Sequence, residues 1–223
     1  MDSAPIPEPP EVTPKIGEGS TRLRPATMDD LDLLLEFFAD PVIERWWFPH
    51  DSKKVSDMIR LSSSPVTETN DEEHFAGWVV LARDGDGETF AGWIQAWEDL
   101  DPEYPSASID IAIAATFHGK GVAGDSLRLV MDYLVRRRGH HRITIDPETD
   151  NARAVAAYRK AGFRDVGVMR HYCRRPDGTL SDGLLMEYVV GIDRPVPSID
   201  RGQPGRGVVR PGGGQVQAPE RRR

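Results

Sequence analysis

Hydrophobic positions recur along this chain with two different periods, and the changes of period predict its secondary structure. Between residues 27 and 38, apolar side chains recur every three or four positions, which predicts an amphipathic helix. Asp40-Pro41 is typical of a helix start, so a second short helix is expected to run from there through Trp46-Trp47. Further helices are expected over residues 52–62, 121–138 and 150–161.

Strands are predicted where the period falls to two, or where a short apolar run lies between turn residues. They cover residues 20–24, 74–83, 89–98, 108–114, 142–146, 163–174 and 180–190. The turn sequences Asp84-Gly85-Asp86-Gly87 and Pro176-Asp177-Gly178 join two pairs of strands as antiparallel hairpins. Together with the helices, these strands predict an α/β (α+β) fold built on a mixed sheet.

The two ends of the chain lack this periodicity. Residues 1–19 are rich in Pro, Glu and Gly, and residues 192–223 are rich in Arg, Pro and Gly, a composition typical of disordered tails. One folded domain is therefore expected over residues 20–191. Neither a signal-peptide pattern nor an apolar run of about 20 residues is visible. The single cysteine, Cys173, has no second cysteine with which to form an internal disulfide. We therefore expect a cytoplasmic protein without a membrane span.

The net charge of −8 is unevenly distributed. Residues 1–20 carry −3 (one Lys against four acidic residues), and residues 192–223 carry +4 (seven Arg against three acidic residues). The region between them therefore carries −9. An acidic domain repels nucleic acid and attracts cations, so the expected partner is a cationic small molecule rather than nucleic acid.

A glycine-rich turn over residues 118–124, with the sequence His-Gly-Lys-Gly-Val-Ala-Gly, precedes a predicted helix. Backbone N–H groups at such a helix start bind phosphate. The turn also fits the dinucleotide-binding pattern Gly-x-Gly-x-x-Gly, but residues 115–118 separate it from its strand, and too little chain follows Asp146 for a doubly wound sheet. A Walker A loop is excluded because Lys120 precedes Gly121 rather than Ser or Thr.

A second motif, residues 151–163 (NARAVAAYRKAGF), reads as a helix closed by Gly162. Together, the two segments resemble the GNAT superfamily of acetyl-CoA-dependent N-acetyltransferases. The motif of that family is Gln/Arg-x-x-Gly-x-Gly/Ala followed by Asn-x-x-Ala-x-x-x-Tyr-x-Lys-x-Gly-Phe. His118 replaces the usual Gln or Arg, and the remaining key positions match: Gly121, Ala123, Asn151, Ala154, Tyr158, Lys160, Gly162 and Phe163.

The resemblance implies both a fold and a cofactor site. The implied fold is a splayed mixed sheet of six to seven strands flanked by helices, and the implied cofactor is acetyl-CoA without a metal. By the same resemblance the CoA would be bound by His118, Gly119, Lys120, Gly121, Val122, Ala123 and Gly124, by backbone groups of Ile111 and Ile113, and by Asn151 and Tyr158. His118 is expected to contribute mainly its backbone. Lys120 as a solvated loop residue and Asn151 as a helix cap remain alternatives.

Asp110 and Tyr158 are the candidates for catalysis. In the family a tyrosine at the position of Tyr158 is the usual partner of the departing thiolate, and a phenol of pKa near 10 can protonate a thiolate of pKa near 8.5. Asp110 interrupts an apolar strand, where an unpaired carboxylate is costly, so it is expected to bind the acceptor amine as a base or as an anchor. A core tyrosine and an outward-facing aspartate are the alternatives.

One subfamily is especially similar. Residues 41–47 (PVIERWW) resemble the Ile-Val-x-x-Trp-Trp segment of aminoglycoside 6'-N-acetyltransferases, and Ile109-Asp110 and Ile145-Asp146-Pro147 stand where that subfamily has Ile-Asp and Thr-Asp-Pro. This implies acetylation of an aminoglycoside, and hence antibiotic resistance, with Trp46, Trp47, Asp110 and Asp146 contacting the acceptor. One of the two tryptophans is also expected in the core, and Asp146 could simply cap a turn.

The acceptor and the assembly stay open at this stage. Other amines that the fold could serve are a siderophore lysine, a polyamine or a protein N-terminus. The alternative that is not an enzyme is a regulatory domain that binds acyl-CoA without turnover. The sequence also leaves open whether the chain forms a homodimer.

Overall fold

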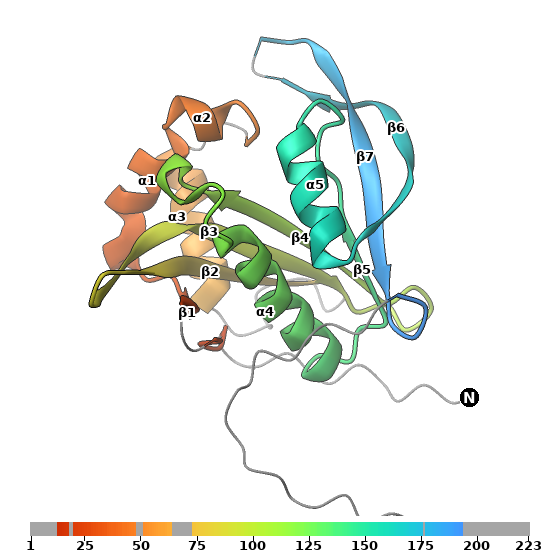
Figure 1. Cartoon of the computed structure of the whole chain (residues 1–223), viewed down its shortest axis with the longest axis horizontal. Helices are drawn as coiled ribbons and strands as arrows, with labels where there is room; N and C mark the ends of the chain where they lie inside the picture. The colour runs from red at the N-terminus through yellow and green to blue at the C-terminus, as the bar shows by residue number, and fades with distance from the viewer. Residues whose placement is uncertain (1–12, 18–19, 48–50, 64–72, 176, 194–223) are drawn as a thin grey trace, which may run out of the picture.

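The computed structural model describes residues 13–17, 20–47, 51–63, 73–175 and 177–193. At its centre lies a seven-stranded sheet with the order β1-β2-β3-β4-β5-β7-β6 (Figure 1). The strands are β1 (Thr21–Pro25), β2 (Glu73–Asp84), β3 (Gly87–Asp99), β4 (Ser106–Ile113), β5 (Arg142–Ile145), β6 (Arg164–Arg174) and β7 (Leu180–Val189). Neighbouring strands run antiparallel except β4 and β5, which run parallel. The predicted mixed sheet is confirmed.

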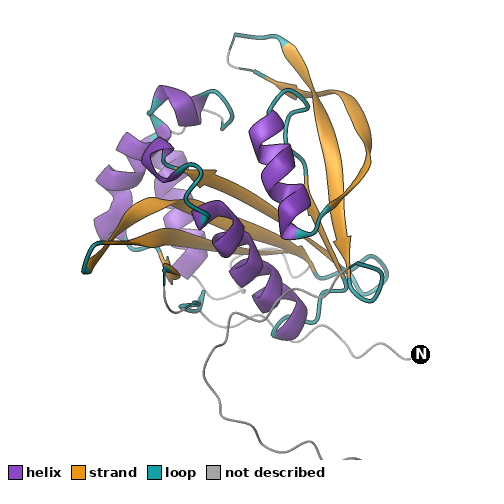
Figure 2. Cartoon of the chain, viewed as in Figure 1, coloured by secondary structure: helices purple, strands orange, loops and turns teal. Residues whose placement is uncertain are grey.

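Helices flank the sheet on both faces (Figure 2). They are α1 (Leu31–Phe38), α2 (Pro41–Glu44), α3 (Ser52–Ser63), α4 (Val122–Arg136) and α5 (Ala152–Ala161), with single 3-10 turns η1 (Met28–Asp30) and η3 (Ala115–Phe117). One apolar cluster includes side chains of α4, α5 and one face of the strands, and a second includes side chains of α1, α3 and residues such as Phe75 and Trp93. Apolar side chains are therefore buried on both faces of the sheet.

The predicted second helix is too long. α2 ends at Glu44, and Trp46 and Trp47 lie in the turn that follows it. The rings of Trp47 and Phe38 pack with their centroids 5.7 Å apart. The helix ends before Trp47, whose ring packs on Phe38 of α1. This is a tertiary contact, and the local sequence does not reveal it.

The domain is longer at both ends than predicted. Within residues 13–17, which were assigned to the N-terminal tail, Ile16 pairs with Leu23 of β1, and the carbonyl of Pro14 accepts a 2.7 Å hydrogen bond from the indole of buried Trp78. At the other end, the side chain of Asp193 accepts the backbone N–H of Val189 at 2.8 Å. Both segments therefore belong to the folded unit. The rest of the predicted tails, residues 1–12, 18–19 and 194–223, lies outside the described residues.

β4 and β5 separate soon after they begin. They pair only at Ala107↔Ile143 and Ser108↔Thr144, and Figure 1 shows them diverging beyond these positions. The backbone N–H of Ala114 bonds to Ala91 on β3 at 2.8 Å. Because backbone groups alternate in direction along a strand, Ile111 and Ile113 turn their N–H and C=O groups away from β3, toward the opening between β4 and β5.

A buried charge cluster lies between β2, β3 and the end of α4. The carboxylate of Glu98 accepts hydrogen bonds from His74 Nδ1 at 2.7 Å, Arg138 Nε at 2.8 Å and His140 Nε2 at 2.6 Å. All four residues are buried. Burial alone would raise the pKa of Glu98, but the hydrogen bonds from the two histidines and the charge of Arg138 outweigh it and lower the pKa to about 2.

Candidate functional site

A cavity of about 890 Å³ occupies the opening between β4 and β5. Its wall contains most of the site residues predicted from the sequence: Trp46, Trp47, Asp110, Ile111, Ile113, His118, Gly119, Gly121, Ala123, Gly124, Asp146, Asn151 and Tyr158. Lys120 and Val122 are not part of this wall. The Lys120 ammonium lies 5.1 Å from the centroid of the Phe117 ring, and the Val122 side chain is buried in the core. The structure thus brings the predicted residues together around one space.

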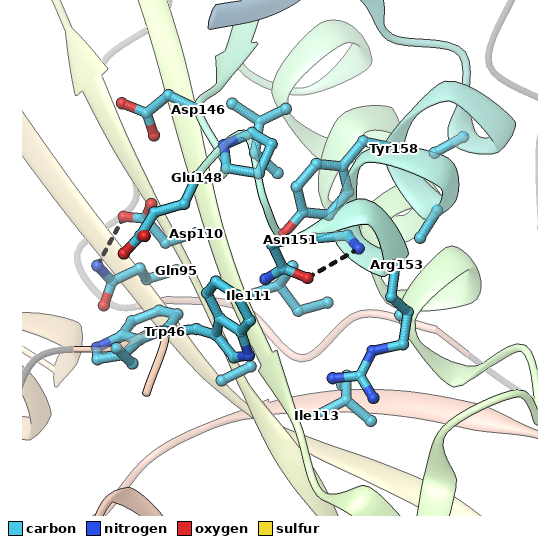
Figure 3. Close-up of a pocket in the computed structure, with 18 of the residues that line it drawn as sticks. Trp46, Gln95, Asp110, Ile111, Ile113, Asp146, Glu148, Asn151, Arg153 and Tyr158 are labelled. Carbon is cyan, nitrogen blue, oxygen red and sulfur yellow. Dashed lines mark hydrogen bonds between the residues drawn. The ribbon is translucent and has the colours of Figure 1, made fainter. Parts of the chain in front are cut away.

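The cavity passes from one face of the sheet to the other. Successive side chains of a strand point to opposite faces, so Asp110 and Ile111 project in opposite directions from β4. Ile111 packs beside the cluster formed with α4 and α5, and Asp110 lies beside Gln95 (Figure 3). One half of the cavity therefore borders the glycine-rich turn and α5, and the other half borders Trp46 and the acidic residues.

The glycine-rich turn has the geometry predicted for it. Gly119 and Gly121 have φ angles of 75° and 87°, in the left-handed region that favours glycine, and Gly121 is the N-cap of α4. A Cβ built on either glycine would meet nothing within 4 Å, so the turn is open on its outer side. The first N–H groups of α4 are thus available to an anionic ligand at the edge of the cavity.

His118 uses its side chain as well as its backbone, which the sequence did not predict. Its Nε2 bonds to the carbonyl of Ile113 at 2.7 Å, so that nitrogen carries the proton. Nδ1 is therefore an acceptor, and the guanidinium of Arg153 donates to it at 2.6 Å. This contact brings an arginine from α5 beside the glycine-rich turn, so the positive charge that the motif often places at position 118 comes from a different element here.

Asn151 and Tyr158 belong to α5. The side chain of Asn151 accepts the N–H of Ala154 at 3.2 Å, so the helix-cap role holds, and the residue also lines the cavity. The phenol of Tyr158 points into the cavity toward β4 (Figure 3). Burial, followed by the charges of Asp110 and Asp146, raises the pKa of Tyr158. The hydroxyl therefore stays protonated around neutral pH and can act as a proton donor.

Asp110 and Asp146 line the same cavity. Burial raises the pKa of Asp110 to about 6, the charge of Asp146 adds to the rise, and a hydrogen bond from Gln95 opposes it. Burial also raises the pKa of Asp146, against a hydrogen bond from Tyr172. Two partly desolvated carboxyl groups on one cavity wall favour the binding of a cation, which stabilises their ionised forms.

The two tryptophans differ in their surroundings. Trp47 packs on Phe38 and joins the core cluster on that face of the sheet, whereas Trp46 has Arg45 over its ring, 4.7 Å from the centroid. Both side chains are half-buried and contribute to the cavity wall. The expectation that one of the two is a core residue therefore fits Trp47.

The wall also contains polar residues that were not predicted as site residues, and four of them are Gln95, Glu148, Arg153 and Tyr172. Tyr172 lies on β6, in the hairpin of β6 and β7, and donates a hydrogen bond to Asp146. Glu148 lies between β5 and α5 and accepts a hydrogen bond from Arg175, which follows β6. Of the four, Gln95 had a signal in the sequence. It is a polar residue in the apolar strand segment 93–97, as Asp110 is in its own strand.

Metal and membrane features are not part of this site. In the part of the chain that the structure describes, no group of three or more His, Cys, Asp and Glu side chains could hold a metal ion. None of the described helices has the length and apolar character needed to cross a bilayer.

A family model and known relatives match this chain. The model of the acetyltransferase (GNAT) domain matches residues 21–164. The spermidine N(1)-acetyltransferase of Escherichia coli (strain K12) is 25% identical over 152 residues, which cover 68% of this chain and 77% of that protein.

Solved structures show the same fold. The spermidine N-acetyltransferase of Vibrio cholerae, in complex with CoA and spermine, has a TM-score of 0.63 at 20% identity and covers 77% of this chain and 96% of that chain. The aminoglycoside acetyltransferase AAC(6')-Ib, in complex with coenzyme A and kanamycin, has a TM-score of 0.58 at 23% identity and covers 77% of this chain and 95% of that chain.

Proposed function

Because the chain belongs to the GNAT family of acetyltransferases, we propose that it transfers the acetyl group of acetyl-CoA to a primary amine of a cationic small molecule, first of all the 6'-amine of an aminoglycoside. The observation that carries this proposal is the placement of Asp110 and Asp146 on one cavity wall. Their charges and the overall acidity of the domain favour a polycation over a neutral or anionic acceptor.

Acetyl-CoA would bind on the side of the glycine-rich turn. The first N–H groups of α4 suit the pyrophosphate, and Arg153, held by His118, adds a positive charge close by. The backbone N–H and C=O of Ile111 and the N–H of Ile113 suit the amides of the pantetheine arm, which would extend the sheet from β4 toward β5. The C=O of Ile113 is already bonded to His118. Asn151 and Tyr158 line the same half of the cavity.

The acceptor would enter on the side of Trp46, Asp110 and Asp146. Sugar rings pack their apolar faces on aromatic side chains, and an ammonium gains cation–π attraction from the indole of Trp46. Asp110 would bind the ammonium and accept its proton, directly or through water. A carboxylate with a pKa of about 6 is a better base than an ordinary aspartate.

The neutral amine would then attack the thioester carbonyl, forming the N–C bond. Collapse of the tetrahedral intermediate breaks the C–S bond, and Tyr158 would give its proton to the departing thiolate. A main-chain N–H of β4 between Ile111 and Ile113 would stabilise the oxyanion. The nitrogen loses two protons in all: the first, taken by Asp110, passes to solvent, and the second, released as the amide forms, restores the phenol of Tyr158 through water.

A polyamine is the second candidate acceptor. A curated relative, 25% identical, is a spermidine N(1)-acetyltransferase, and a structure of the same fold is a complex with spermine. Polyamines carry the same kind of charge as aminoglycosides but lack sugar rings, so they would use the two carboxylates and depend less on the indole of Trp46.

Steady-state kinetics with kanamycin, spermidine, lysine and a peptide with a free N-terminus would test the proposal. We expect the highest kcat/KM with kanamycin, and a large loss of kcat/KM for Trp46→Ala with kanamycin but not with spermidine. Highest kcat/KM with spermidine, unchanged in Trp46→Ala, would select the polyamine. Efficient turnover of the peptide or lysine with none of either polycation would refute a polycationic acceptor.

A further inference from the structure

Gln95 connects the buried side chain of Trp93 with the carboxylate of Asp110 on the cavity wall. It lies on β3 directly opposite Asp110 on β4. The indole Nε1 of Trp93 donates to Oε1 of Gln95 at 2.9 Å, and Nε2 of Gln95 donates to Oδ2 of Asp110 at 3.0 Å. Figure 3 shows the second bond, between neighbouring strands of the sheet.

The tryptophan decides which way the amide of Gln95 points. Trp93 is fully buried, and an indole N–H can only donate a hydrogen bond. The carbonyl oxygen of Gln95 must therefore face Trp93, because the reverse orientation would set two donors against each other in the interior. The NH₂ group must then face Asp110. A hydrogen-bond donor is thus held permanently against one oxygen of that carboxylate.

We propose that Gln95, locked in orientation by Trp93, is a positioning residue that keeps Asp110 a hydrogen-bond acceptor and presents it to the incoming amine. This role rests on the proposed function, in which Asp110 receives the acceptor. The amine needs an ionised carboxylate, and a buried aspartate can also be a neutral acid. Gln95 is the residue that favours the ionised form of Asp110.

The surroundings of Asp110 otherwise favour the neutral acid. Burial and the negative charge of Asp146 both raise its pKa, whereas the bond from Gln95 lowers it. The other titratable or charged residues of the cavity wall, by element, are Lys54 of α3, His118 of the turn before α4, Arg128 of α4, Glu148 after β5, Arg153, Tyr158 and Lys160 of α5, and Tyr172 and Cys173 of β6. None of these is hydrogen-bonded to Asp110 among the described contacts, and Gln95 is.

The test replaces Gln95 by Met, which keeps the length of the side chain and removes the amide. The carboxyl group of Asp110 is titrated by NMR in the free enzyme, with Thr144→Ser as a control that alters the same cavity. We expect its pKa in Gln95→Met to rise by about one unit above that of the wild type, the order of a single lost hydrogen bond to a carboxylate. Thr144→Ser should match the wild type.

A second variant, Gln95→Glu, tests the orientation itself. One oxygen of the new carboxyl can accept from Trp93, and the other then faces Asp110, so the two carboxyls compete for one proton. We expect the upper pKa of this pair to exceed the value for Asp110 in Gln95→Met, and the acidic limb of kcat/KM to move with it.

An unchanged Asp110 pKa in folded Gln95→Met would overturn the proposal. If that variant fails to fold, an upper pKa of the pair in Gln95→Glu equal to the pKa of Asp110 in the wild type would overturn it equally. The titration needs no acceptor, so it tests the role of Gln95 independently of the substrate. Failure of every amine as a substrate would count against the proposed function and not against this role.

Discussion

Tyr172 donates its phenolic hydrogen to Oδ2 of Asp146, and both residues line the cavity. An irregularity in β6 makes this contact possible. His171 has a φ of 53°, and its N–H is held by the carboxylate of Asp182 at 2.8 Å. A Cβ on Gly183 would come within 2.7 Å of the Tyr172 ring, so only glycine leaves room for the ring there. His171, Asp182 and Gly183 of this hairpin thus position the phenol of Tyr172.

Replacing Tyr172 by Phe should weaken acceptor binding and spare the cofactor. Losing the hydrogen bond frees the Asp146 carboxylate to rotate, at a cost of about 0.5–1.5 kcal/mol. We expect KM for a cationic acceptor to rise about 3- to 10-fold, with the Kd of acetyl-CoA unchanged by calorimetry. Exposed Tyr104, changed to Phe, is the matched control. An increase in the Kd of acetyl-CoA equal to that in KM would show that Tyr172 supports the whole cavity instead.

Replacing Tyr158 by Phe should reduce turnover rather than binding. The raised pKa of this phenol keeps its proton in place until the thiolate departs. General acid catalysis contributes typically about 10²–10⁴-fold, so we expect kcat to fall within that range while the Kd of acetyl-CoA stays within about twofold. Rapid-quench and steady-state kinetics would measure this. A variant that retains full kcat at saturating substrate would make Tyr158 a core residue without a chemical role.

Replacing Glu98 by Gln should destabilise the fold and change its response to acid. Removing the charge leaves Arg138 buried without its carboxylate, at a cost of about 3–5 kcal/mol. The folded pKa of Glu98, about 2, lies below its ordinary value of 4.5. Its contribution is therefore present above pH ~4.5 and is lost as the pH falls from there toward 2.

Urea unfolding at several pH values would measure this effect. The stability difference between wild type and Glu98→Gln should shrink steadily below pH ~4.5, whereas exposed Glu103→Gln should follow the wild type throughout. If the difference in unfolding free energy does not change with pH, the charge of Glu98 does not contribute to stability, and only the packing of the cluster does.

Shortening the N-terminus should have two distinct effects. A chain that begins at Thr13 keeps the carbonyl that accepts from Trp78, and we expect its Tm to match that of the full chain. A chain that begins at Ser20 loses that acceptor and the pairing of Ile16 with Leu23. We expect it to lose about 1–3 kcal/mol, which corresponds to a Tm several degrees lower by calorimetry. Equal melting of the two shortened chains would contradict the structural role of residues 13–17.

Local patterns were enough to predict the order of the elements and the two motif segments. The turn before α4 and the helix that carries Tyr158 could be predicted because glycine turns and helix caps depend on residues that are adjacent in the sequence. Asp110 was found for a similar reason, as a single charge inside an apolar strand.

The remaining parts of the site depend on contacts between distant segments. Tyr172 reaches Asp146 because β6 is irregular and Gly183 leaves room for the ring. The residues next to Tyr172 in the sequence predict neither feature. Arg153 approaches the turn through His118, 35 residues away. The end of α2 and the start of the domain were misplaced for the same reason, because Trp47 and Pro14 are held by tertiary partners that local propensity does not include.

The passage of the cavity through the sheet has a kinetic consequence. A molecule on the side of the glycine-rich turn and another on the side of Trp46 approach β4 from opposite faces, so neither has to leave before the other arrives. Both can therefore be present when the acetyl group moves, and no residue has to store that group in between. Initial rates measured with both substrates varied should give intersecting double-reciprocal lines, the behaviour of a ternary complex, and not the parallel lines of a ping-pong exchange.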